Sequence, residues 1–484
     1  MKHRILWAFV LSVNFLLFTS CNNDDEGLPP TTSINDFIWK SMNLWYFWQS
    51  EVPNLADDRF SSNSEYEQFL QSQDPAQLLY GLLYDYGNTD RFSWIVDDYH
   101  ALENQFAGIN VSFGMDYGFV LYNENSGQVF GYVQYVIPNS PAFNSGIKRG
   151  DIFTKINGTV LTQSNYLQLI SGNTLTFGLG YLENGELHHS NEEITLTKTQ
   201  IQENPIYQME VFNLNGIRIG YLVYNAFRAN FNYELNQAFG ILKNYNIDEL
   251  ILDLRYNGGG SVQTASYLGS MITGQFLNQP FTHLTFNQKT SNNNTSYYFG
   301  NYGKDYDDQL NEIGTFQLQH LNLSKLYVIT SRNTASASEM LIGCLAPYIQ
   351  VQTIGTRTYG KTVGSITLYD SPSTYFTSSQ NVNPSHKWAL QPIVFDYKNA
   401  QHQFGPTFGI LPDYEINEIH YLENLPELGD LNEPLLNAAI SMITPPKTSP
   451  LQPKNFQLRH LKSSQMLERF GMEMYLDKGV ELIP

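Results

Sequence analysis

Residues 325–349 read KLYVITSRNTASASEMLIGCLAPYI, and this stretch decides the fold. The apolar run KLYVIT is typical of a buried strand, and MLIGCLAPYI has the composition of a helix that follows it. Between them, TASASE at residues 334–339 places three hydroxyl side chains at the start of the helix. Ser336 and Glu339 have the spacing of a capping box, in which each side chain satisfies a backbone N–H of the other. The alternative is that one of the hydroxyls is a nucleophile.

The same alternation of apolar strands and amphipathic helices extends on both sides of this stretch, over residues 201–444. It predicts an α/β core of β-α-β layers with buried, largely parallel strands. Residues 31–105 have apolar side chains at helical intervals, so we expect an N-terminal helical region there. Residues 106–200 change to short alternating runs split by glycine, which predicts a small all-β domain. Residues 445–484 form a weakly patterned C-terminal tail.

The first 21 residues have the pattern of a secretory signal. A basic start at Lys2, His3 and Arg4 precedes an apolar run that is too short to span a bilayer, and small residues lead to Cys21. The segment FTSC resembles a bacterial lipoprotein signal, in which Cys21 carries the lipid. The acidic residues 22–30 are typical of a solvated tether and resemble the tract that directs lipoproteins of Bacteroidetes-type bacteria to the cell surface.

Charge and cysteine content exclude several classes of function. The formal net charge is −19, which argues against nucleic-acid binding because phosphate contacts need clustered Lys and Arg. With Cys21 lipidated, Cys344 is the only other cysteine, so no internal disulfide can form. Its apolar neighbours favour a buried packing role. No metal-binding spacing of His and acidic residues appears, and we expect neither a metal nor another cofactor.

Two further segments of the α/β core could take part in chemistry. LDLRYNGGG, residues 252–260, is a buried strand that runs into glycines before a helix, and it exposes backbone N–H groups. A tight strand-to-helix turn would also account for it, whereas a phosphate loop would need a Lys-Ser or Lys-Thr that is absent. GTRTYGKTVGS, residues 355–365, holds Lys361 in a glycine-flanked turn. A desolvated, neutral lysine can act as the base for a serine nucleophile, although a lone lysine in such a turn is usually solvated.

Together these segments resemble the carboxyl-terminal processing peptidases, the tail-specific proteases of peptidase family S41. Lys361 stands 25 residues after Ser336, the interval of the family's Ser-Lys dyad, and Ser331 and Ser338 do not fit this interval. The resemblance implies a ClpP/crotonase-like core, with Ser336 as nucleophile and Lys361 as base. It also implies an oxyanion hole made by the N–H of Ala337 and that of Gly259 or Gly260. DRFS at 90–93 and FGILPDYEI at 408–416 are similar to further family segments.

The all-β region carries a second resemblance. SPAFNSGIKRGDIFTKINGTVL, residues 140–161, is similar to a PDZ-domain phrase, and family S41 proteases carry such a domain before the catalytic region. A PDZ domain binds a peptide as an added strand. We expect the peptide-binding loop at residues 112–119, with Phe113, Gly114, Gly118 and Phe119.

One residue departs from the family pattern. Many members have a Gln four residues after the lysine that helps to orient it, and this chain has Ser365 there. Two function classes therefore stay open: a serine endopeptidase that cleaves proteins or peptides near their C-termini, and a peptide-binding surface lipoprotein with impaired catalysis. Histidine is a rival base, but the histidines are scattered, and His188 and His189 fall in the all-β domain. A binding protein for small apolar ligands is a third alternative, suggested by the aromatic content.

The expected partners and location follow from the same resemblance. The substrate would be the C-terminal tail of a protein or peptide. A lipid on Cys21 would anchor the chain at the cell envelope, on the periplasmic side or the outer surface of the outer membrane.

Overall fold

The computed structural model describes residues 30–445, 452–453, 457–468 and 470–483. The signal segment, Cys21 and the tether, on which several of the expectations above depend, lie outside the described residues. Within them, no helix is both long and apolar enough to cross a bilayer.

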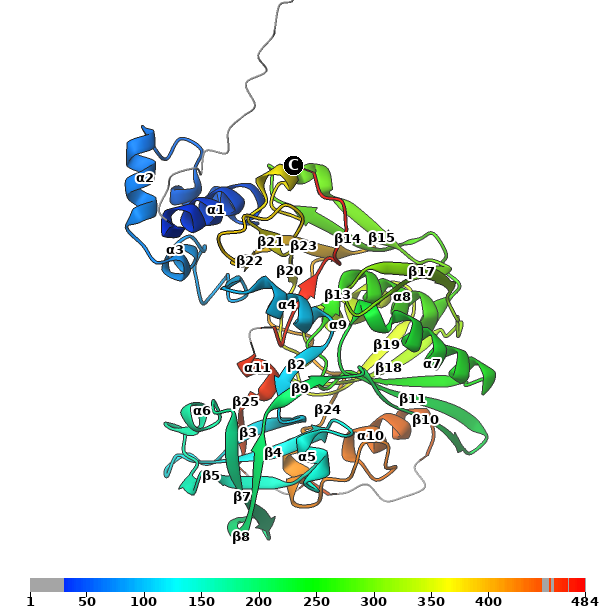
Figure 1. Cartoon of the computed structure of the whole chain (residues 1–484). Coiled ribbons are helices and arrows are strands. Elements are labelled where there is room, and N and C mark those ends of the chain that lie inside the picture. Colours follow the sequence, from blue (N-terminus) through cyan, green and yellow to red (C-terminus); the bar gives the residue numbers. More distant parts are fainter. Residues whose placement is uncertain (1–29, 446–451, 454–456, 469, 484) are drawn as a thin grey trace, which may run out of the picture.

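The N-terminal region is helical, as its apolar periodicity predicts (Figure 1). Asp74 caps α3 by accepting hydrogen bonds from the backbone of Ala76 and Gln77, and Pro75 occupies the first helical position, where no N–H is needed. Trp45 and Tyr46 at the end of α1 are fully buried. The elements are α1 (Pro30–Trp45), two 3₁₀ turns (Gln49–Glu51 and Pro53–Leu55), α2 (Asn63–Gln71), α3 (Pro75–Gly81), β1 (Trp94–Val96) and α4 (Tyr99–Phe106).

A small β unit follows, with strand order β25-β3-β4-β5-β7-β8. Its core is a cluster of aromatic rings in which Phe119 and Phe177 both pack on Phe153. Gly131 makes room for that ring, because a Cβ there would lie 2.0 Å from it. The elements are β2 (Ile109–Ser112), β3 (Met115–Asn123), β4 (Gln128–Val136), α5 (Pro141–Asn144), β5 (Ile152–Ile156), β6 (Thr159–Val160), α6 (Tyr166–Leu169), β7 (Thr174–Glu183), β8 (Glu186–Thr197), β9 (Thr199–Gln202) and β25 (Arg459–Ser463).

The α/β core is built on a six-stranded sheet of order β10-β11-β12-β18-β19-β24, parallel from β11 onward. Alternate residues of its strands face opposite layers. Leu252 and Val328 pack in the cluster that contains α8 and α9, whereas Ile251 and Tyr327 pack with the residues of α10. The elements are β10 (Ile206–Leu214), β11 (Ile217–Tyr224), α7 (Asn232–Asn244), β12 (Glu249–Asp253), α8 (Val262–Thr273), β18 (Lys325–Thr330), α9 (Ala337–Leu345), β19 (Gln350–Gly355), β24 (Tyr414–Glu415) and α10 (Pro434–Ile443). The fold is therefore α/β, as the alternation predicts.

A second, mixed sheet has the order β13-β26-β20-β23-β14-β15. Its strand β26 (Met474–Tyr475) comes from the segment expected to be a weakly patterned tail, so the end of the chain is part of the core. The other elements are β13 (Gly260–Ser261), β14 (Pro280–Phe286), β15 (Thr295–Tyr298), β16 (Tyr302–Tyr306), β17 (Glu312–Gln317), β20 (Val363–Ser365), β21 (Leu368–Tyr369), β22 (Ala389–Gln391), β23 (Ile393–Asn399), α11 (Ser464–Leu467) and 3₁₀ segments at Ala229–Phe231, Ser291–Asn293, Pro372–Thr374 and Glu418–Asn424.

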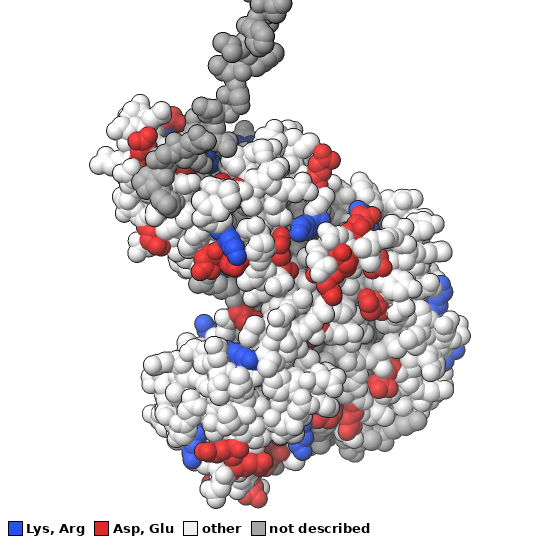
Figure 2. Space-filling view, in the orientation of Figure 1, with Lys and Arg blue, Asp and Glu red and all other residues white. Residues whose placement is uncertain are grey.

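The molecule is hollowed between the N-terminal helices and the small β unit (Figure 2). The edge strand β25 and the helix α11 lie on the side of the small β unit that faces this opening (Figure 1). The chain then runs through β26 to its last described residues, where Ile483 bonds to Asn293 in the connection between β14 and β15 (Figure 1).

Candidate active site

Ser336 stands at the N-cap of α9, in the connection from β18. Its φ is +64°, a region that residues other than glycine rarely adopt, so the backbone is strained at this one serine. The side chain is fully buried, and among the described residues its hydroxyl has no hydrogen-bond partner. The neighbouring hydroxyls are tied down: Thr334 donates to Leu254 O at 2.7 Å and Ser338 to Asn257 O at 3.0 Å. Ser336 therefore carries the unpaired hydroxyl of TASASE.

The glycine turn lies directly against this serine. Asn257 shapes the turn, since its side chain donates to Tyr224 O and accepts from the N–H of Gly259. Gly259 has a φ of +109°, and a Cβ on it would lie 2.8 Å from Ser336 Cβ and 2.9 Å from Ala337 N. The N–H of Ala337 is the first of the helix and has no acceptor within it. The turn thus lies against Ser336 and the N–H of Ala337, while the N–H of Gly259, one of the expected oxyanion donors, is already bound to Asn257.

Glu339 joins Ser336 to the turn that carries Lys361. One of its oxygens accepts from the N–H of Ser336 and from that of Lys361, each at 2.9 Å. The other accepts from the Thr358 hydroxyl and from Gly360 N–H. Burial raises the pKa of Glu339, although all four hydrogen bonds act to lower it. Glu339, which the sequence predicts as one half of a capping box, therefore also links Ser336 to the turn that carries Lys361 through shared hydrogen bonds.

The Lys361 amine points to the C-terminal segment of the chain. It is fully buried and donates to Met472 O at 2.8 Å and to Glu473 Oε2 at 2.9 Å. It also lies 5.0 Å from the centre of the Phe92 ring, in the DRFS segment. Its partners in the described chain do not include the Ser336 hydroxyl, which is unpaired. The sequence predicts an amine that faces the serine, whereas here the amine is ion-paired with a carboxylate.

Ser365, expected as a possible orienter of the lysine, contacts the partner of the lysine instead. Its hydroxyl donates to Glu473 Oε2 at 3.2 Å and accepts from Gln391 Nε2 at 2.9 Å. Trp94 donates to the other oxygen of Glu473. Burial raises the pKa of Glu473, and Lys361 opposes this effect. Glu473 was not among the residues predicted from the sequence, and the available signal was an acidic residue among the apolar ones in GMEMYL.

The four residues expected to bind a peptide lie on β3 of the small β unit and directly before it. Phe113 and Phe119 are buried in its core, so their side chains are structural. Gly114 has a φ of +79°, and its carbonyl accepts from the Ser140 hydroxyl. Gly118 lies on the edge of β3 and pairs with Ser463 of β25. The edge expected to receive a peptide is therefore covered by the chain itself.

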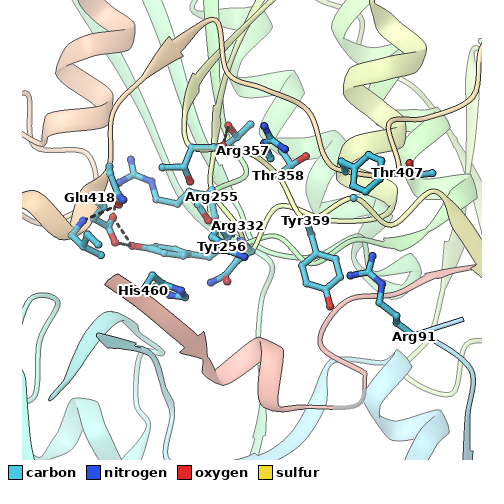
Figure 3. Close-up of a pocket in the computed structure, with 18 of the residues that line it drawn as sticks. Arg91, Arg255, Tyr256, Arg332, Arg357, Thr358, Tyr359, Thr407, Glu418 and His460 are labelled. Carbon is cyan, nitrogen blue, oxygen red and sulfur yellow. Dashed lines mark hydrogen bonds and ion pairs between the residues drawn. The ribbon is translucent and has the colours of Figure 1, made fainter. Parts of the chain in front are cut away.

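A cavity of about 1090 Å³ adjoins the lysine turn (Figure 3). Arg91, Arg332 and Arg357 line it and are all exposed. Arg91 also stacks over the rings of Phe92 and Tyr359. Arg91, Arg332 and Arg357 thus form a basic wall of the cavity in an otherwise acidic protein, adjacent to the turn that holds Lys361.

A buried charge network fixes the start of the glycine turn. Arg255 forms ion pairs with Asp253, Glu418 and Glu433. Arg149, from the PDZ-like phrase in the small β unit, pairs with the same Glu418 at 2.7 Å. Burial raises the pKa of Glu418, but the two arginines outweigh this effect and hold it at about 2. The network joins the small β unit to the core.

The remaining sequence candidates lie elsewhere. His188 and His189 are on β8, where His189 contacts Thr154 and His188 stacks on Tyr181. Cys344 is buried, and burial raises the pKa of its thiol to about 12. Over the described ranges, no group of three or more His, Cys, Asp or Glu residues is arranged to hold a metal ion.

These features define an α/β protein with a buried, unpaired serine between a helix start and a glycine turn. Two family models match: the peptidase family S41 domain at residues 218–416 and the peptidase S41 N-terminal domain at residues 33–94. The chain belongs to peptidase family S41, which confirms the resemblance seen in the sequence.

Individual relatives agree with this assignment. The chain is 27% identical over 232 residues to a carboxyl-terminal-processing protease of Picosynechococcus, a match of 46% of this chain and 49% of that protein. It is 26% identical to the chloroplastic carboxyl-terminal-processing peptidase 2 of Arabidopsis thaliana, over 46% of this chain and 40% of that one. The match thus spans less than half the length of these relatives. A crystal structure of an S41 protein from Bacteroides fragilis superposes with a TM-score of 0.64 at 27% identity, and covers 84% of this chain and 96% of the other.

Proposed function

We propose that the protein is a serine endopeptidase in which Ser336 is the nucleophile and Lys361 the general base. The observation that carries the proposal is the Ser336 hydroxyl, which is buried and unpaired within the described structure, at a strained position next to the glycine turn. A buried hydroxyl without a partner is costly to stability, and such costs are typical of functional sites. Family membership supports the same activity.

In the proposed reaction, Ser336 Oγ attacks the carbonyl carbon of a peptide bond while Lys361 accepts the hydroxyl proton. The N–H groups of Ala337 and Gly260 donate to the oxyanion that forms. Each such donor contributes about 3 kcal/mol to catalysis in serine proteases. Lys361 then passes the proton to the leaving amine, and water hydrolyses the acyl-enzyme. The ion pair with Glu473 must open first, because a carboxylate partner favours the protonated amine.

The substrate would be a protein or peptide cleaved near its C-terminus. The names of the relatives support this class, and the small β unit, with its PDZ-like phrase, would receive the peptide along β3. For the location we propose the cell envelope, with a lipid on Cys21 in the outer membrane. This part rests on the sequence alone, and loss of labelled palmitate incorporation in Cys21→Ala would test it.

The second candidate is a peptide-binding lipoprotein with impaired catalysis. The observation that favours it is the ion pair between Lys361 and Glu473, with Ser365 in place of a lysine-orienting glutamine.

Labelling with a fluorophosphonate probe and digestion of casein separate the two candidates. The peptidase should be labelled at Ser336 and should digest casein, and Ser336→Ala and Lys361→Ala should each abolish digestion without loss of fold. Proteolysis retained by either purified variant would refute the dyad. Absence of labelling across a range of pH would favour the binding protein.

A further inference from the structure

The end of the chain docks on the small β unit as an added strand. β25 runs antiparallel to β3, with Arg459 opposite Leu121 and Ser463 opposite Gly118. The next residue, Ser464, donates to Asp116 at 2.6 Å and accepts from Tyr117 N–H. Strand addition to an exposed sheet edge is a common way in which proteins bind extended peptides.

The same segment then reaches the glycine turn. β26 pairs in parallel with β13, with Met474 opposite Gly260. The carbonyl of Glu473 accepts from Gly260 N–H at 2.5 Å, and it lies 2.3 Å from the position of a Cβ on Gly259. That same Cβ position is 2.8 Å from Ser336 Cβ. A main-chain carbonyl of the chain therefore uses a donor that a substrate carbonyl would need, beside the serine.

The side chain of Glu473 blocks the second part of the dyad. Its carboxylate and the Met472 carbonyl take the hydrogen bonds of the Lys361 amine. Lys361 is 0% exposed and Glu473 is 4% exposed, so water does not screen the pair. The tail thus contacts the proposed base and an oxyanion donor together.

From these contacts we infer that residues 459–468 and 470–475 bind in the groove that takes the polypeptide substrate, and that this segment competes with substrate for it. The inference rests on the proposed function for the identity of the groove. It also names the substrate class: an unfolded segment of about 15 residues, the span from Arg459 to Glu473, that bridges the β3 edge and the glycine turn. A folded domain cannot present such a segment, whereas an unfolded chain or an extended tail can.

Tethering makes this competition strong. The segment and the groove belong to the same chain, and binding sites joined within one chain meet at effective concentrations that reach the millimolar range. Substrate at micromolar concentration would displace it only where substrate binds much more tightly. The enzyme would therefore rest in a closed state and open for polypeptides that fill both parts of the groove.

The test compares two variants of the full chain, both in a Ser336→Ala background that prevents turnover. Glu473→Gln removes the charge that pairs with Lys361 and keeps the side-chain shape. Glu481→Gln makes the same change at an exposed site that follows the segment in the chain. The probe is a fluorescent, reduced and carboxymethylated lactalbumin, which stays unfolded, and its binding is followed by anisotropy. Thermal unfolding verifies that both variants are folded.

Glu473→Gln should bind the unfolded probe at least tenfold more tightly than Glu481→Gln, which should match the parent. Saturating probe should also increase hydrogen exchange at residues 459–463 and 471–475. Equal affinity of the two variants, no binding by either, or binding that leaves exchange of the tail unchanged would overturn the inference. A failure of the proposed function would give a different result from a failure of this inference. Fluorophosphonate labelling and casein digestion would be absent both in the chain that retains Ser336 and in its Glu473→Gln variant, but the difference in probe affinity between Glu473→Gln and Glu481→Gln would persist. A loss of labelling caused by Glu473→Gln alone would make Glu473 part of the catalytic apparatus and would also overturn it.

Discussion

Replacement of Arg149 by Met should strongly destabilise the contact between the small β unit and the α/β core. Arg149 is 4% exposed and donates to the Pro426 and Gln134 carbonyls, to the Tyr256 hydroxyl and to Glu418. Methionine keeps much of the volume but removes the charge and every donor. Glu418 would then keep Arg255 as its remaining arginine partner.

The magnitude follows from the buried ion pairs of Glu418. The fall of its pKa from the ordinary 4.5 to about 2 shows that Arg149 and Arg255 together more than offset the effect of burial. Removal of one partner from a buried ion pair costs about 3 to 5 kcal/mol in other proteins, because the remaining charge stays buried. We therefore expect a loss of about 3 kcal/mol at neutral pH.

The pH dependence has a definite sign. Because the pKa of Glu418 is depressed in the folded state, its stabilisation is present above pH 4.5 and is lost as the pH falls toward 2. Without Arg149 this pKa rises, so acid unfolding of the variant should begin at a higher pH than in the parent.

Urea unfolding from pH 7 to pH 3, combined with hydrogen exchange of β3–β5, measures both effects. The matched control is Arg218→Met, since Arg218 forms an ion pair with Asp248 in which both side chains are more than 40% exposed. That variant should change stability little. The reasoning is refuted if Arg149→Met costs no more than Arg218→Met, or if the acid transitions of the parent and of Arg149→Met coincide.

Three further predictions concern the site. Glu339→Gln places an amide group opposite backbone N–H donors, so Ser336 and the turn that carries Lys361 lose their common acceptor. This variant should lower kcat about 10²-fold with little change in KM. Steady-state kinetics on a casein-derived peptide measure both values, and a change in KM alone would contradict the prediction. Gly259→Ala places a methyl group against Ser336 and the Glu473 carbonyl. It should reduce fluorophosphonate labelling more than about 10²-fold and increase hydrogen exchange of residues 471–475. Unchanged exchange would contradict the close contact. Arg357→Glu should raise KM for acidic peptides and leave neutral ones unaffected, with an effect that shrinks as salt is added; an equal effect on both peptides would exclude a role for the basic wall in recognition.

The main sheet was predictable because its signals are local. Strands β11 and β18 are apolar runs, and the helices α7 and α9 begin a few residues after them. The second sheet was not predictable in this way. β13 and β26 have two residues each and β20 has three, too short for periodicity, and they form strands because distant segments supply the hydrogen bonds.

The residues of the site also fall into those that the local sequence predicts and those that it does not. Ser336 and Lys361 could be proposed because a fixed interval in one chain segment links them to a family pattern. Glu473 is separated from Lys361 by more than 100 residues and lies in a stretch without a clear pattern, so only the fold brings the two together. The four hydrogen bonds that Glu339 accepts could be predicted only in part. Its spacing from Ser336 predicts the bond to the Ser336 N–H but carries no information about the bonds to the turn at 358–361.

The departure at Ser365 has a physical explanation if the tail is an occupant of the groove. A glutamine at this position would be larger than serine, in a site where Ser365 is fully buried against Glu473. Serine leaves room for the Glu473 carboxylate, and Gln391 from β22 supplies an amide to the Ser365 hydroxyl. When the tail leaves, Ser365 and Gln391 remain as the polar groups on the side of Lys361 that Glu473 had filled. Ser365 departs from the family pattern for a lysine-orienting residue, and its small side chain is what allows the closed state to form.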